Sequence, residues 1–181
     1  MTQTAVVGPA TPGAEPATDP VPASTVRFDT RRFCPEGVDP FATVDWVPVD
    51  VELKHHQTGE VVFSQKGVEA PAPWSYRAVQ TAAEKYFRRN VPSLPAGRET
   101  SVKELIVRVA DTIADHGLSA GYFTAAERAA FRDDLCWLLL HQHVAFNSPV
   151  WFNVGLSHKY GMASDHEAYY YDPKARGGLG F

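Results

Sequence analysis

The chain has 181 residues and 44% hydrophobic residues, which is enough for one domain with an apolar core. Its formal net charge of −4 argues against non-specific binding to nucleic acid, because such binding needs an excess of Lys and Arg to displace counterions. No apolar run approaches the roughly 20 residues that span a bilayer, and no secretion signal is readable, so we expect no membrane association.

Residues 1–27 are rich in Ala, Pro, Thr and Gly and contain almost no large apolar side chains. Such a segment cannot bury enough surface to offset the entropy of ordering it. We therefore predict a disordered tail, with order beginning near Phe28 or Phe33.

Residues 28–70 are predicted to form an ordering segment and a β-hairpin. From Val47 to Lys54, apolar and polar residues alternate as on a strand with one buried face. Thr58 and Gly59 supply a turn, and residues 61–63 are the predicted returning strand. Two strands alone are marginal in water, so the hairpin must pack on another element. The residues expected on the buried face are Val47, Val49, Val51 and Leu53.

Residues 71–147 are predicted to form three helices. The first begins after Ser75, with an apolar stripe, and ends before Pro92 and Pro95. The second begins with a capping box, and Gly117 stands where a left-handed cap would end it. The capping box of the second helix is formed by Ser101 and Glu104. The apolar stripe of the first helix consists of Val79, Ala82, Ala83, Tyr86 and Phe87. That of the second helix consists of Val102, Leu105, Ile106, Val109 and Ile113.

The third helix is predicted to begin with a second capping box, formed by Thr124 and Glu127. It continues through residues 131–139 towards Phe146. From Leu135 onward it is apolar on nearly all sides, which indicates a central helix with several neighbours.

Residues 148–181 are predicted to hold a functional turn and the start of a further region. From Gly155 the helical periodicity is lost, and the segment ends in a glycine-rich, aromatic stretch. We interpret Phe181 as a break within a longer sequence, because a domain seldom stops in such a stretch.

The histidines and cysteines do not predict a metal site or a nucleophile. His141 and His143 are two residues apart on the predicted helix and so point to different faces, whereas metal pairs prefer spacings of three or four. Cys34 and Cys136 lie far apart, which argues against a disulfide scaffold and favours a reduced, cytoplasmic setting. Neither thiol has a context that would activate it. The other histidines are His55 and His56 before a turn, His116 in the second helix, and His158 and His166 in the final segment.

The segment Phe146–Gly155 has two interpretations. The preceding helix is expected to end at Asn147, which tolerates a left-handed backbone, with Ser148 as the N-cap and Pro149 as the first residue of a new helix. The resulting turn could bind an anion or a ribose hydroxyl. Alternatively, it is a corner between helices held by Trp151 and Phe152. Residue chemistry alone leaves both open.

The same segment, with the sequence FNSPVWFNVG, resembles a signature of adenosylcobalamin-dependent (class II) ribonucleotide reductases. Shorter matches occur in the same order along the chain, and the resemblance extends from about Phe33 to the end. The shorter matches are GEVVF at 59–63, VEAP at 68–71, Trp74-Ser75, KYF at 85–87, RETSV at 98–102 and GYF at 121–123.

This resemblance implies that the chain is the N-terminal helical lobe of a larger α/β barrel enzyme, a ribonucleoside-diphosphate reductase. Ser148 inherits a substrate-binding role, with Asn147 as its neighbour, and no catalytic residue is assigned. The redox and radical cysteines and the adenosylcobalamin site would lie in regions beyond this chain, which alone is expected to be inactive. The implied partners are a ribonucleotide substrate, nucleotide effectors, a thiol reductant such as thioredoxin, and a second copy in a homodimer. The alternative is a free-standing helical interaction module without catalysis.

Overall fold

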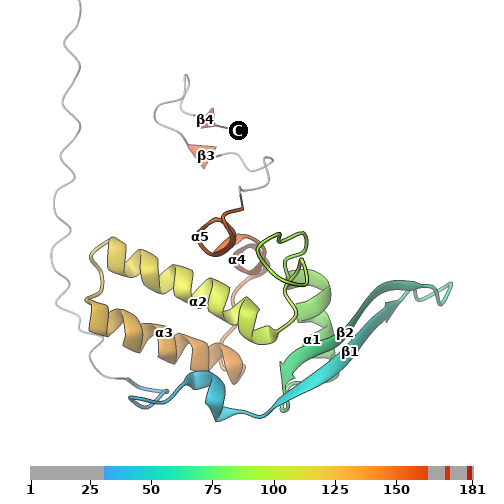
Figure 1. Cartoon of the computed structure of the whole chain (residues 1–181), viewed down its shortest axis with the longest axis horizontal. Helices are drawn as coiled ribbons and strands as arrows, with labels where there is room; N and C mark the ends of the chain where they lie inside the picture. Colours follow the sequence, from blue (N-terminus) through green and yellow to red (C-terminus); the bar gives the residue numbers. More distant parts are fainter. Residues whose placement is uncertain (1–30, 163–169, 172–178, 181) are drawn as a thin grey trace, which may run out of the picture.

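The computed structural model describes residues 31–162, 170–171 and 179–180, so the predicted tail of residues 1–27 and His166 lie outside the described residues. A group of helices carries one β-hairpin that projects from its side (Figure 1). The predicted mainly α fold with a β-hairpin is confirmed. The elements are η1 (Pro40–Thr43), β1 (Trp46–Lys54), β2 (Val61–Pro71), α1 (Tyr76–Thr81), η2 (Ala82–Tyr86), α2 (Val102–Ser119), α3 (Ala125–Leu140), α4 (Ser148–Asn153), α5 (Leu156–Tyr160), β3 (Tyr170–Tyr171) and β4 (Leu179–Gly180).

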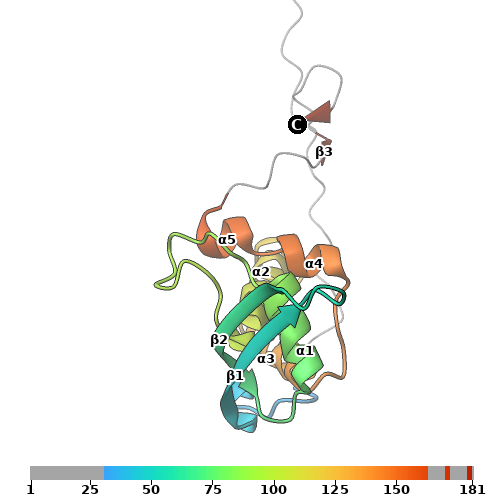
Figure 2. The ribbon, with the colours of Figure 1, turned by 90° about the vertical axis from the view of Figure 1, so that its right-hand side faces the viewer.

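The hairpin pairs β1 with β2 in antiparallel register, and β2 continues to Pro71 rather than ending at residue 63 as predicted. The predicted inward face is confirmed for Val49, Val51 and Leu53, which are half-buried or buried. The prediction is wrong for Val47, which is exposed because Trp46 instead packs against the core at that end of the strand. The hairpin rests on α1 and α2, which supplies the support that two strands require (Figure 2).

The first predicted helix is observed as α1, with the Ser75 hydroxyl accepting a hydrogen bond from the Ala78 amide at 3.2 Å. It continues into the single π-helical turn η2, in which the Phe87 amide donates to the Ala82 carbonyl at 2.9 Å. The predicted stripe is buried, except that Tyr86 is only half-buried.

Both predicted capping boxes are confirmed, at the starts of α2 and α3. The prediction for Gly117 is wrong, because this residue lies inside α2. A Cβ there would lie 2.3 Å from the Phe123 ring, so the glycine allows the following loop to fold against the helix. The left-handed glycine after α2 is Gly121, with a φ of +76°.

The third helix ends at Leu140, well before Phe146, so its predicted end is wrong. Gln142 has a φ of +57°, and the amides of Gln142 and His143 donate to the Leu139 and Leu138 carbonyls at 3.2 and 2.9 Å. These two bonds form a Schellman motif, which ends the helix although no glycine is present.

The central helix is α2 rather than α3, contrary to the prediction. α3 contacts α2 and η1, whereas α2 also contacts β2, η2, α4 and α5 (Figures 1 and 2). The predicted loss of helical structure from Gly155 is also wrong, since α5 follows immediately and packs on α2. No helix in the described part of the chain has the length and apolar character needed to cross a membrane.

Candidate functional site

The two residues predicted to bind substrate, Asn147 and Ser148, lie at the start of α4. Asn147 is the N-cap, and its φ of −69° and ψ of 161° are extended, so the predicted left-handed geometry is wrong. Ser148 is the first helical residue rather than the N-cap, and Pro149 is the second. The physical reason is the early end of α3, because the chain then approaches α4 as an extended segment instead of through a tight reversal.

The hydroxyl of Ser148 pairs with the hydroxyl of Tyr86, and their oxygens are 3.2 Å apart. Ser148 is half-buried, whereas the Asn147 side chain is exposed and makes no capping bond to α4 in the described part of the chain. The Tyr86 ring packs against Trp151 and Phe152, with centroid distances of 6.2 and 5.4 Å. The aromatic corner that the sequence offered as one alternative is therefore present, and the Ser148 hydroxyl lies beside it. Binding of an anion or a ribose hydroxyl by this turn stays a prediction.

Arg108 of α2 holds the far end of α4. Its guanidinium donates to the carbonyl oxygens of Val154 at 2.6 Å and Trp151 at 3.0 Å, and to that of Tyr86 at 3.4 Å. The last carbonyl groups of a helix have no hydrogen-bond donors within the helix, and Arg108 supplies donors for those at the end of α4. The segments that carry Tyr86 and Ser148 are thus tied to one side chain.

Glu99 balances the charge of Arg108, and both side chains are fully buried. The Arg108 Nε donates to Glu99 Oε1 at 2.7 Å, and the Arg88 amide donates to Oε2 at 2.7 Å. The Tyr160 hydroxyl of α5 donates to Oε1 at 2.8 Å, and burial together with Glu99 raises the pKa of this phenol. Every charged group in this buried cluster is paired and hydrogen-bonded, as its burial requires.

Gly155 allows α5 to begin directly against Arg108. Its φ is +86°, and a Cβ at this position would lie 2.5 Å from the Arg108 carbonyl oxygen and 2.8 Å from Thr112 Oγ1. Only glycine combines this backbone conformation with this close approach.

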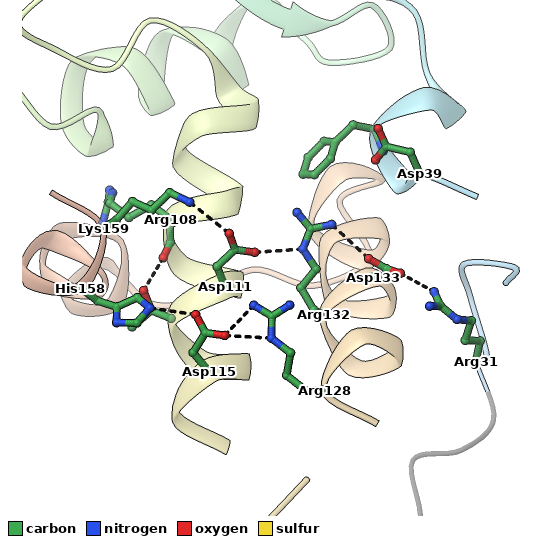
Figure 3. A network of polar contacts seen from close by, with 12 residues as sticks. Arg31, Asp39, Arg108, Asp111, Asp115, Arg128, Arg132, Asp133, His158 and Lys159 are labelled. Carbon is green, nitrogen blue, oxygen red and sulfur yellow. Dashed lines mark hydrogen bonds and ion pairs between the residues drawn. The ribbon is translucent and has the colours of Figure 1, made fainter. Parts of the chain in front are cut away.

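Partly exposed ion pairs join α5, α2 and α3 beside the buried cluster (Figure 3). Asp115 of α2 accepts hydrogen bonds from Arg128 of α3 at 2.6 Å and from His158 of α5 at 2.8 Å. Asp111 pairs in the same way with Arg132 at 2.9 Å and Lys159 at 3.2 Å. Two polar contacts, one to Asp111 and one to Asp115, therefore join α5 to the central helix α2.

An open, mainly apolar cleft of about 420 Å³ lies beside the hydroxyl pair, and Tyr86 and Trp151 form part of its wall. Leu105 of α2, Leu139 of α3 and Trp74, which lies just before α1, also line the cleft. The cleft therefore adjoins the candidate turn through the ring of Tyr86.

Sequence reasoning missed the roles of Tyr86 and Arg108. It treated Tyr86 as a core residue, although a tyrosine within an aliphatic stripe needs a partner for its hydroxyl. Arg108 follows Leu105 by three residues and precedes Val109, which places it at the buried stripe of α2. An arginine at such a position must find a buried acid, and this signal was available in the sequence.

Comparison with known proteins identifies the family. The family model described as class II vitamin B12-dependent ribonucleotide reductase matches residues 49–142, which is just over half of the chain. The chain belongs to this family. The matched range ends before Asn147, so the family match does not include the two residues predicted to bind substrate.

Class II reductase relatives show the same similarity. The chain is 44% identical over 149 residues to the vitamin B12-dependent ribonucleotide reductase of Rhodopirellula baltica, covering 81% of the chain and 14% of that protein. It is 40% identical over 134 residues to the protein of the same name from Streptomyces avermitilis, covering 74% of the chain and 14% of the relative. The chain thus spans about 14% of the length of these relatives.

The two cysteines lie inside the fold of this class II reductase chain. Burial raises the pKa of Cys136 to about 12, and it also raises the pKa of Cys34, whose thiol donates to the Val38 carbonyl at 3.3 Å. The thiol forms therefore dominate at neutral pH. His141 and His143 both contact the Trp137 ring, and the described residues contain no group of three or more potential metal ligands.

The cleft beside Tyr86 does not fit a cobalamin. The corrin ring carries many amide side chains that need polar partners, whereas the described cleft is mainly apolar, at about 420 Å³, and no histidine or cysteine lines it.

Proposed function

We propose that the complete protein is an adenosylcobalamin-dependent ribonucleoside-diphosphate reductase, which converts ribonucleotides to 2′-deoxyribonucleotides for DNA synthesis. The observation that carries this proposal is the family match over residues 49–142. The cofactor, bound elsewhere in the protein, would start thiyl radical chemistry, and a thiol system such as thioredoxin would supply electrons. Nucleotide effectors, a homodimeric state, a cytoplasmic location and a catalytic barrel downstream belong to the same proposal.

Within this enzyme, the present chain would form one wall of the substrate site. Ser148 offers a half-buried hydroxyl that Tyr86 already orients, and Asn147 offers an exposed amide beside it. A hydroxyl held in this way can donate to or accept from a ribonucleotide without first being ordered, which reduces the entropic cost of binding. The role of these residues is to bind and orient, and the aromatic side chains around them help to exclude water.

The test is Ser148→Ala in the full-length reductase, assayed by deoxyribonucleotide formation with adenosylcobalamin and a dithiol. Loss of one neutral hydrogen bond is worth about 0.5–1.5 kcal/mol, so the substrate constant should rise about two- to tenfold. The contact with Tyr86 is also lost, so the thermal midpoint should fall slightly.

Thr124→Ala is the matched control, because it removes the N-cap hydroxyl of α3 far from the turn. It should cost about 1 kcal/mol of stability and leave the substrate constant unchanged. An unchanged substrate constant in Ser148→Ala would mean that Ser148 only supports the fold. Absence of reductase activity in the wild-type full-length protein would refute the proposed reaction itself.

A further inference from the structure

We propose that Arg108, aligned by Glu99, is a positioning residue that sets the Tyr86–Ser148 hydroxyl pair. The inference rests on the proposed substrate role of Ser148. Arg108 does not reach the hydroxyls, and it acts through the backbone segments that carry them.

The first argument is connectivity. One guanidinium binds the carbonyl oxygen of Tyr86 itself, at 3.4 Å, and the carbonyl oxygens of Trp151 and Val154 at the end of α4. Ser148 is the first residue of that same helix. A single planar group therefore bridges the two segments whose hydroxyls meet at 3.2 Å.

The second argument is the weakness of α4 on its own. It has six residues, and a helix this short is not stable in isolation, since helix formation needs more turns to offset nucleation. Its position must therefore come from outside contacts. Trp151 supplies the apolar contact, and Arg108 supplies partners for the last carbonyl groups.

The third argument is the geometry of the ion pair. Glu99 accepts from Arg108 through Oε1 and also through Oε2, at 2.7 and 3.4 Å, which fixes the plane of the guanidinium. Tyr160 and the Arg88 amide hold the carboxylate in turn. A buried ion pair is weak support for a fold, because apolar side chains of similar size often serve as well. The planar guanidinium group is needed instead because it directs several N–H donors at once, which the ammonium group of a lysine cannot do.

The experiment compares Arg108→Lys, Ser148→Ala and the double variant in the full-length reductase. The matched control is Arg132→Lys, which alters an ion pair between α3 and the same helix α2 without touching the turn. The measurements are KM and kcat for the ribonucleotide, the thermal midpoint, and hydrogen exchange of the amides of residues 147–155.

If Arg108 acts through Ser148, Arg108→Lys raises KM about two- to tenfold, as Ser148→Ala does. It adds little in the Ser148→Ala background, because coupled residues are non-additive. Exchange at residues 147–155 rises in Arg108→Lys and not in Arg132→Lys. Tyr160→Phe, which removes one bond to Glu99 and keeps the ring, gives a smaller change in the same direction and serves if Arg108→Lys does not fold.

Two results overturn the positioning role. One is a lowered thermal midpoint with unchanged KM and unchanged exchange at residues 147–155. The other is a KM increase of the same factor with and without the Ser148 hydroxyl. Faster exchange at the turn, combined with an unchanged KM in Ser148→Ala, instead supports the positioning of the turn and refutes the substrate role of Ser148.

Discussion

Replacement of Gly155 by alanine is predicted to destabilise the fold more than the same replacement at Gly161. The two glycines flank α5, and both have a left-handed backbone, with φ values of +86° and +65°. At Gly161 an added Cβ would meet no described atom within 4 Å, whereas at Gly155 it would lie 2.5 Å from the Arg108 carbonyl oxygen and 2.6 Å from Arg108 Cγ. The pair therefore separates backbone strain from steric contact.

The magnitudes follow from these two terms. A left-handed backbone costs a non-glycine residue about 1–2 kcal/mol, which is the loss expected for Gly161→Ala. Overpacking against a fixed backbone adds about 1–3 kcal/mol, so Gly155→Ala should lose about 2–5 kcal/mol. The added loss arises because α5 must move away from Arg108, which weakens the packing of α5 on α2.

Urea unfolding of the 181-residue chain, followed by circular dichroism, measures the difference. The midpoints should fall in the order wild type, Gly161→Ala, Gly155→Ala, with similar slopes, so that the shift reports stability rather than a changed denatured state. Equal midpoints for the two variants would refute the close approach of Gly155 to Arg108. A wild-type midpoint for Gly155→Ala would refute the strain argument as well.

Three further predictions concern other parts of the chain. Burial alone would raise the pKa of Asp115, but hydrogen bonds from His158 and Arg128 outweigh burial and hold this pKa below its usual value. The contribution of Asp115 to stability is therefore present above about pH 4 and lost as the pH falls. Below this pH, the stability of Asp115→Asn should depend less on pH than that of the wild type in an acid unfolding experiment. Cys136 is fully buried, with a pKa raised to about 12, so a thiol reagent at neutral pH should label it only when urea is added, and rapid labelling of the native chain would contradict its burial. Gly117→Ala should displace the Phe123 ring, which should lower the free energy of unfolding by about 1–3 kcal/mol. The higher helix propensity of alanine should restore about 0.5–1 kcal/mol of this loss, and a urea titration measures the net change.

The features predicted well from the sequence are those decided within a few residues. The capping boxes at Ser101 and Thr124 satisfy amides three residues away, and the alternation from Val49 to Leu53 follows from the pleat of one strand. Each needs no knowledge of distant segments, so the local pattern is sufficient.

The errors occur where a distant or unusual contact decides the structure. α3 ends at Leu140, before a left-handed Gln142, which the sequence does not predict because glycine or asparagine is the usual residue at that position. Gly117 is required by the ring of Phe123 rather than by a cap. The cluster around Arg108 joins residues 86, 99, 151 and 154, and no local periodicity predicts which of these segments meet.

The segment Phe146–Gly155 can be divided into residues that this chain's own fold requires and residues that it does not. Phe146 and Trp151 pack edge to face at 5.6 Å in the core. The Val154 carbonyl accepts from Arg108, and Gly155 allows the approach of α5. Packing against the core or a close backbone approach thus accounts for Phe146, Val150, Trp151, Val154 and Gly155, which are five of the ten positions.

Asn147 and Phe152 stand apart from this set. Asn147 is exposed and provides no capping bond to α4, and Phe152 is 42% exposed although its ring touches Tyr86. The exposed part of the Phe152 ring and the exposed Asn147 amide contribute little to the described core. Their chemistry, a stacking surface and a hydrogen-bonding group beside an oriented hydroxyl, matches what a nucleotide requires of its site. Among the exposed residues of this segment, Asn147 and Phe152 are therefore the ones whose chemistry suits the proposed substrate role of Ser148.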